Sequence, residues 1–79
     1  MALAESIKMT RQKALMTQES FAEALHVSLA TVNSWEVGKS KPNMAAMKAI
    51  KTFCAENNLS YEDIESEWLL TIQKRDQSK

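Results

Sequence analysis

The chain has 79 residues, of which 44% are hydrophobic and 25% charged, with one glycine and one proline. This composition excludes a disordered tail and favours a single compact helical domain with one modest core. The formal net charge is zero, so the whole chain exerts no overall attraction on nucleic acid.

The charge is nevertheless unevenly distributed along the chain. Residues 1–51 carry seven lysine and arginine residues against four glutamates, a net charge of +3, whereas residues 52–79 carry three basic against six acidic residues, a net charge of −3. Any attraction to phosphate is therefore local to the surface that the first part presents.

Several functional classes are not expected. No apolar stretch is long enough to span a membrane, and the N-terminus lacks the pattern of a secretory signal, which predicts a cytoplasmic protein without a membrane partner. One cysteine and one histidine, Cys54 and His26, provide no internal disulfide, no metal-ligand cluster and no paired nucleophile and base. We therefore expect neither an enzyme nor a cofactor.

The first predicted helix covers residues 3–14, because Leu3, Ile7 and Ala14 fall on one face. Arg11 lies on the same apolar stripe, where a charged side chain requires a partner.

Residues 17–38 contain two short helices with only two residues between them. Thr17 is placed to cap a helix that ends near Leu25, and Ser28 to cap a helix over residues 29–37 that Gly38 terminates. So short a connection requires a steep crossing, which small Ala22 permits, and this is the helix-turn-helix arrangement. His26 tolerates the left-handed backbone expected in the turn better than most residues.

Two further helices complete the prediction. Asn43 caps a helix that ends near Asn57, and another runs over about residues 60–75. The core stripe of the fourth helix is predicted to contain Met44, Met47, Ile50, Phe53 and Cys54. The stripe of the fifth is predicted to contain Tyr61, Ile64, Trp68 and Ile72, and Leu69 and Leu70 widen it beyond what one small domain buries. We therefore predict an all-α single domain over residues 1–79, with its core in residues 3–59.

Residues 7–59 resemble the phage-repressor type of helix-turn-helix domain, the Xre family. The matching residues are Arg11, Thr17-Gln18, Ala22, Val27-Ser28, Thr31-Val32, Trp35-Glu36, Gly38 and Pro42. Leu15 and His26 stand at positions that are often glycine in the family.

The resemblance implies a five-helix repressor-like fold in which the helix from Leu29 to Val37 is the recognition helix. It also implies that Arg11 pairs with Glu36, while Ala22 and Gly38 have structural roles. The last helix is the usual dimer contact of the family, and we assign that contact here to Trp68, Leu69 and Leu70.

Four polar side chains are predicted to hold the DNA backbone. Gln18 and Ser28, each near the start of a helix, are placed to bind phosphate, and Lys39 and Lys41 flank the loop after the recognition helix. As alternatives, Gln18 and Ser28 act only as solvated or capping residues, and the two lysines belong to an ordinary solvated loop.

The base-reading residues are predicted on the recognition helix itself. Leu29 and Ala30 can contact a thymine methyl group, and Asn33 can form a bidentate contact with adenine, with Ser34 assisting. Thr31 has three interpretations, as a phosphate ligand, a contact to a thymine methyl group or a packing residue.

The main hypothesis is a sequence-specific transcriptional regulator, a repressor that binds a two-fold operator of double-stranded DNA as a homodimer. An antitoxin that binds a toxin partner and regulates its own operon is an alternative within this class. A protein-interaction module that keeps the fold without binding DNA is another, favoured by the zero net charge and by apolar Leu29 and Ala30.

Overall fold

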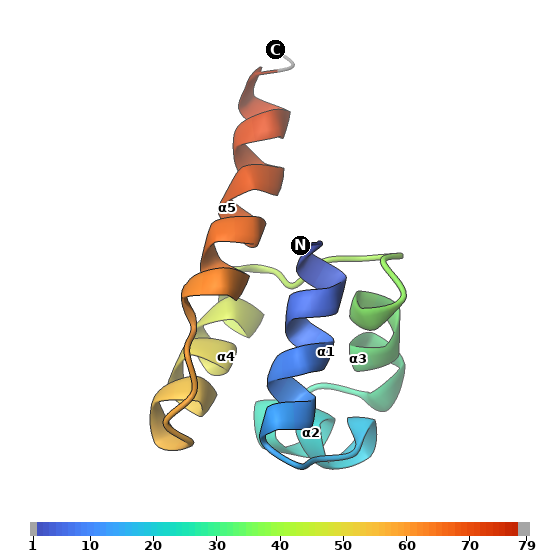
Figure 1. The fold of residues 1–79 in the computed structure, drawn as a ribbon. Helices are drawn as coiled ribbons and strands as arrows, with labels where there is room; N and C mark the ends of the chain where they lie inside the picture. The colour runs from blue at the N-terminus through green and yellow to red at the C-terminus, as the bar shows by residue number, and fades with distance from the viewer. Residues whose placement is uncertain (1, 78–79) are drawn as a thin grey trace.

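A computed structural model describes the backbone of residues 2–77 and the side chains of residues 2–72. It contains five helices and, within that range, no strand: α1 (Leu3–Lys13), α2 (Gln18–Leu25), α3 (Leu29–Glu36), α4 (Met44–Glu56) and α5 (Glu62–Gln77). The all-α, five-helix prediction is confirmed. In Figure 1, α2 lies at the base of the body, and α5 continues well beyond it. No described helix is both long and apolar enough to cross a membrane.

Side-chain caps fix where three of the helices begin, as predicted. The hydroxyl of Thr17 accepts a hydrogen bond from the backbone N–H of Ser20 at 3.1 Å, and the side chain of Asn43 accepts one from Ala46 at 2.8 Å. Ser28 caps α3 in the same way. Each bond satisfies a backbone donor that the first helical turn leaves without a partner.

Left-handed backbone conformations separate the helices. His26 adopts φ +61° between α2 and α3, and Gly38 adopts φ +82° after α3, as the sequence predicted. Leu15, after α1, has φ +59° although its side chain is 92% exposed. A leucine bears the full steric cost of this conformation and gains no burial in return.

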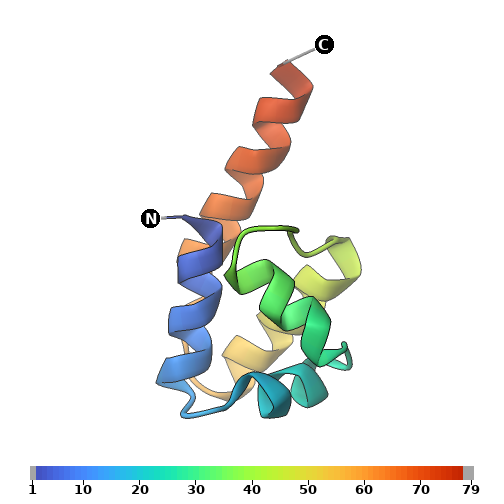
Figure 2. The same cartoon turned by 90° about the vertical axis from the view of Figure 1, so that its right-hand side faces the viewer.

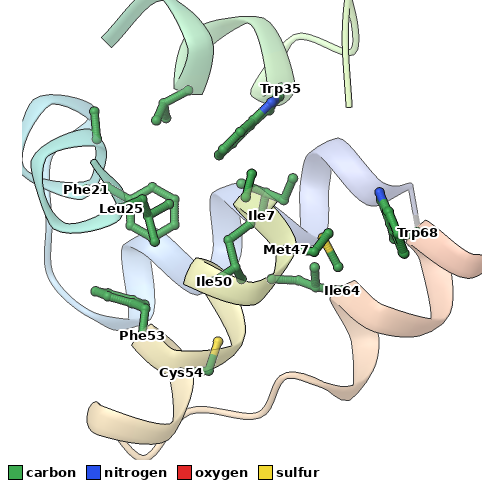
Figure 3. Packing of buried hydrophobic residues seen from close by; sticks show 13 residues of the cluster. Ile7, Phe21, Leu25, Trp35, Met47, Ile50, Phe53, Cys54, Ile64 and Trp68 are labelled. Carbon is green, nitrogen blue, oxygen red and sulfur yellow. The ribbon is translucent and has the colours of Figure 1, made fainter. Parts of the chain in front are cut away.

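All five helices contribute to one hydrophobic core (Figure 3). Ile7 of α1, Phe21 of α2, Val32 of α3 and Ile50 of α4 are completely buried. The rings of Phe21 and Phe53 meet edge to face with centroids 5.2 Å apart, a favourable aromatic geometry. This core fixes the orientation of α2 and α3.

The expectation that Met44 belongs to the core was wrong, and Trp68, which was assigned to the dimer contact, packs in the core of its own chain. Met44 is 62% exposed, because it is the first residue of α4 and precedes the part of the helix that reaches the core. Trp68 belongs to the core of its own chain at 8% exposure, and its indole N–H donates to the carbonyl oxygen of Pro42 at 2.7 Å. Trp68 is therefore an internal anchor rather than a residue on the open face of α5.

Candidate nucleic-acid interface

The surface of interest is formed by α3, which faces the viewer in Figure 2. The turn from α2 into α3 is closed by a hydrogen bond of 3.0 Å from the N–H of Val27 to the carbonyl of Ala22. Ala22 is buried, and α2 packs against α3. One side of α3 packs inward through Val32 and Trp35, and its other side remains open.

A buried ion pair braces the end of α3 against α1. Nε of Arg11 donates to Oε2 of Glu36 at 2.8 Å, and Nη2 donates to Oε1 at 3.0 Å. The remaining terminal nitrogen of Arg11 donates to the carbonyl of Met16 at 2.9 Å. The Arg11 and Glu36 side chains are only 13% and 3% exposed. The pair that the resemblance implies is thus present, in the bidentate geometry that favours strong charge-assisted bonds.

The charge of Glu36 depends on these partners. Burial alone raises its pKa, but hydrogen bonds from Arg11 and Gln18, together with the positive charges of Arg11 and Lys8, outweigh that effect and lower the pKa below 4.5. Glu36 is therefore ionised at neutral pH and holds Arg11 and Gln18 in place.

Gln18 has a structural partner that the sequence did not predict. Its side-chain nitrogen donates to Oε1 of Glu36 at 3.0 Å, which orients the amide at the start of α2. An amide nitrogen carries two hydrogens, so a second donor remains for a phosphate oxygen. The bond to Glu36 positions Gln18 without using up its hydrogen-bonding capacity.

The first turn of α3 brings together two hydroxyl groups. Ser28 Oγ accepts from the N–H of Thr31 at 3.1 Å, and the two side-chain oxygens lie 2.8 Å apart. One hydroxyl donates to the other, which leaves one hydroxyl hydrogen for an external acceptor. Ser28, Thr31, Lys41 and Asn43 line a depression of about 500 Å³ between α3 and α4. The structure thus places the predicted phosphate ligands Ser28 and Lys41 at one depression, while Gln18 and Lys39 lie outside it.

The outward face of α3 is mostly apolar. Leu29 is 47% exposed, and Ala30 and Asn33 are also exposed. The Asn33 side-chain amide has no hydrogen-bond partner among the described residues, which leaves both its donor and its acceptor groups available. Val37, the residue after α3, is 58% exposed. Val37 was predicted to end the recognition helix, but it was not predicted as a surface residue of the interface.

Ser34 connects α3 to the basic loop. Its hydroxyl lies 2.8 Å from that of Ser40, and its carbonyl accepts from the N–H of Lys39 at 2.9 Å. Lys39 is exposed and Lys41 is half-buried. The loop is fixed at its far end because Pro42 is buried and accepts the hydrogen bond from Trp68. Ser34 and Trp68 therefore hold the loop that carries both lysines, a role the sequence did not reveal.

The described residues contain no group of three or more histidine, cysteine, aspartate or glutamate side chains able to hold a metal ion. Cys54 is buried, and burial raises the pKa of its thiol. It is a neutral core residue.

The sequence matches the helix-turn-helix family model over residues 7–56. It is 41% identical over 49 residues to the HTH-type transcriptional activator BcrR of Enterococcus faecalis, a match that covers 62% of this chain and 24% of BcrR. It is also 41% identical over 54 residues to the type II methyltransferase M.SsoII of Shigella sonnei, covering 65% of this chain and 14% of that enzyme. The chain thus spans only a small part of the length of these relatives. No solved structure matches it significantly.

Proposed function

The chain belongs to the helix-turn-helix family, of the Xre type, and from this premise we propose that it is a transcriptional regulator that inserts α3 into the major groove of double-stranded DNA. The observation that carries the proposal is the open face of α3, where the Asn33 amide is free and the Arg11–Glu36 pair fastens the end of the helix to α1. A rigid scaffold that presents a polar side chain on an exposed helix suits direct readout of base edges.

In this proposal one set of residues positions the protein on the DNA backbone. Gln18, Ser28 and Thr31 contact phosphate from the starts of α2 and α3, and Lys39 and Lys41 contact it from the loop after α3. The depression lined by Ser28, Thr31 and Lys41 supports this assignment, because it gathers two hydroxyls and an ammonium group beside the reading helix.

A second set reads the sequence. Asn33 forms the bidentate contact with adenine, and Leu29 and Ala30 contact thymine methyl groups. Ser34 assists through its link to Ser40, which keeps the start of the basic loop close to the end of α3.

We further propose that the active species is a homodimer on a two-fold operator whose half-sites lie about one helical turn apart. Leu69 and Leu70 are exposed on α5, the helix that extends past the body (Figure 1). Leu70 also lines a groove of about 400 Å³ with Ala2, Leu3 and Thr71. A second copy would remove this apolar surface from water, which is the main driving force for association.

We infer that the protein acts in the cytoplasm as a repressor, because blocking a promoter by occupying it requires nothing beyond the DNA interface. BcrR is named an activator, and that activity belongs to a much longer protein. The same interface would serve an antitoxin that regulates its own operon, so a toxin partner would change none of the roles assigned to α3.

The test is selection of bound duplexes from a random library, followed by affinity measurements on the selected site at several salt concentrations. We expect a palindromic site. A dimer carries two copies each of Lys39 and Lys41. If each of these four lysines neutralises one phosphate, the logarithm of the association constant should fall with the logarithm of the salt concentration at a slope of roughly −3.6. A protein that enriches no sequence and binds no duplex at low salt would instead be a protein-interaction module.

A further inference from the structure

The outward face of α3 presents a ridge of apolar side chains around a single amide. This apolar ridge consists of Leu29, Ala30 and Val37, with Asn33 between them. We propose that the apolar ridge makes recognition depend on thymine methyl groups on both sides of the base pair that Asn33 contacts. The inference rests on the proposed function, and it specifies the kind of half-site and adds Val37 as a specificity-determining residue.

The spacing of these residues places them along one line of the helix. Leu29, Asn33 and Val37 follow one another at intervals of four residues, which puts them on the same face. Eight residues of helix span about 12 Å, and base pairs are stacked about 3.4 Å apart. The apolar ridge is thus long enough to cover three to four base pairs, with Asn33 near the middle.

The two hydroxyl groups beside the apolar ridge are each paired with a second hydroxyl. The hydroxyl of Thr31 is bonded to Ser28, and that of Ser34 to Ser40. Asn33 is therefore the polar side chain on the outward face of α3 that makes no side-chain hydrogen bond to a described residue.

This distribution discriminates between base pairs. A G·C pair presents hydrogen-bonding atoms without a methyl group in the major groove, and an apolar side chain would remove those atoms from water without replacing the lost bonds. An A·T pair presents the thymine methyl group, which Leu29 or Val37 can cover. The expected half-site therefore has thymine-containing pairs on either side of the adenine that Asn33 reads.

Val37 is suited to this role by its position. It is 58% exposed, and it follows α3 at a point where the chain is held by the hydrogen bond from Lys39 to Ser34. Because the side chain is outside the core, Val37→Ala changes the recognition surface without opening a cavity.

The experiment replaces single thymines of the selected operator by deoxyuridine, which removes the methyl group and keeps the base pairing. Affinities are measured for the full chain and for Val37→Ala. The matched control is Met44→Ala, which removes an apolar side chain of comparable exposure from α4.

We expect uracil to weaken binding about three- to tenfold at positions on both sides of the adenine, as the burial of one methyl group implies. Val37→Ala should abolish the uracil effect at the positions on one side only, and Met44→Ala should abolish none. A site that binds equally well with uracil would overturn the inference and leave the proposed function intact. Additive effects of Val37→Ala and uracil on the binding free energy would show that Val37 does not contact the thymine methyl groups. Failure to bind any duplex would reject the proposed function as well.

Discussion

Replacing Arg11 by alanine should be the most damaging single substitution in the brace behind the DNA-binding surface. The guanidinium group donates two hydrogen bonds to Glu36 and a third to the carbonyl of Met16. After the substitution, the Glu36 carboxylate would keep only the hydrogen bond from Gln18 among these partners. A carboxylate that is 3% exposed would then be buried without a compensating positive charge in contact.

The expected loss follows from that burial. Removing one partner of a buried ion pair costs 3–5 kcal/mol, and because Arg11 is itself 13% exposed, we expect the lower end, about 3 kcal/mol. For a domain of this size, such a loss should lower Tm by about 12 to 24 °C.

Thermal and urea denaturation of the wild type and of Arg11→Ala measure this effect. The matched comparison is the cycle completed by Glu36→Ala and the double mutant. We expect the double mutant to be much less destabilised than the sum of the two single mutants, because it leaves no isolated charge. Unchanged stability of Arg11→Ala, or additive losses, would refute the reasoning.

The pH dependence of the stability provides an independent test of the Arg11–Glu36 pair. The pKa of Glu36 is lowered in the folded protein. The stability that ionised Glu36 contributes is therefore fully present above the ordinary pKa of 4.5 and is lost as the pH falls through the lowered pKa. In Arg11→Ala the largest remaining effect is burial, which raises this pKa. The difference in stability between the two proteins should therefore shrink as the pH falls below neutral.

Three further sets of substitutions separate base reading, backbone geometry and assembly. Asn33→Ala should cost about 1 to 3 kcal/mol of binding free energy on the selected operator and relax the preference at one base pair, whereas Lys39→Ala should weaken binding equally on all sequences. Equal behaviour of both mutants on matched and mismatched duplexes would contradict this division. Leu15→Gly should raise the stability by roughly 0.5 kcal/mol, because the release of left-handed backbone strain exceeds the cost of the greater backbone entropy of glycine in the unfolded chain. Leu15→Ala should change the stability little. A lower Tm for the glycine variant would contradict this prediction. Replacing Leu69 and Leu70 by serine should shift the sedimentation of a dimer toward that of a monomer, and an unchanged profile would remove α5 from the interface.

The features that the sequence predicted well are local. The caps Thr17, Ser28 and Asn43 bond within the first turn of their own helices, and Gly38 needs only its own positive φ to end a helix. Short sequence patterns were therefore sufficient to place these helix boundaries. Hydrophobic periodicity then identified most of the buried residues of α4 and α5.

The features that the sequence did not predict depend on contacts between distant segments. Trp68 lies on a predictable apolar stripe, but the pattern gives no indication that its indole reaches a carbonyl 26 residues away. The bond from Gln18 to Glu36 spans 18 residues and is equally invisible in local patterns. Met44 shows the opposite failure, because it fits the stripe of α4 and yet lies beyond the edge of the core.

The central claim, that α3 is the surface that enters DNA, is tested most directly by following backbone amide NMR signals while the selected duplex is added to the protein. We predict that the largest changes fall on residues 28–37, with smaller ones at Gln18 and at Lys39 to Lys41. Changes confined to α4 or α5, with the signals of α3 unaffected at saturating duplex, would contradict the account.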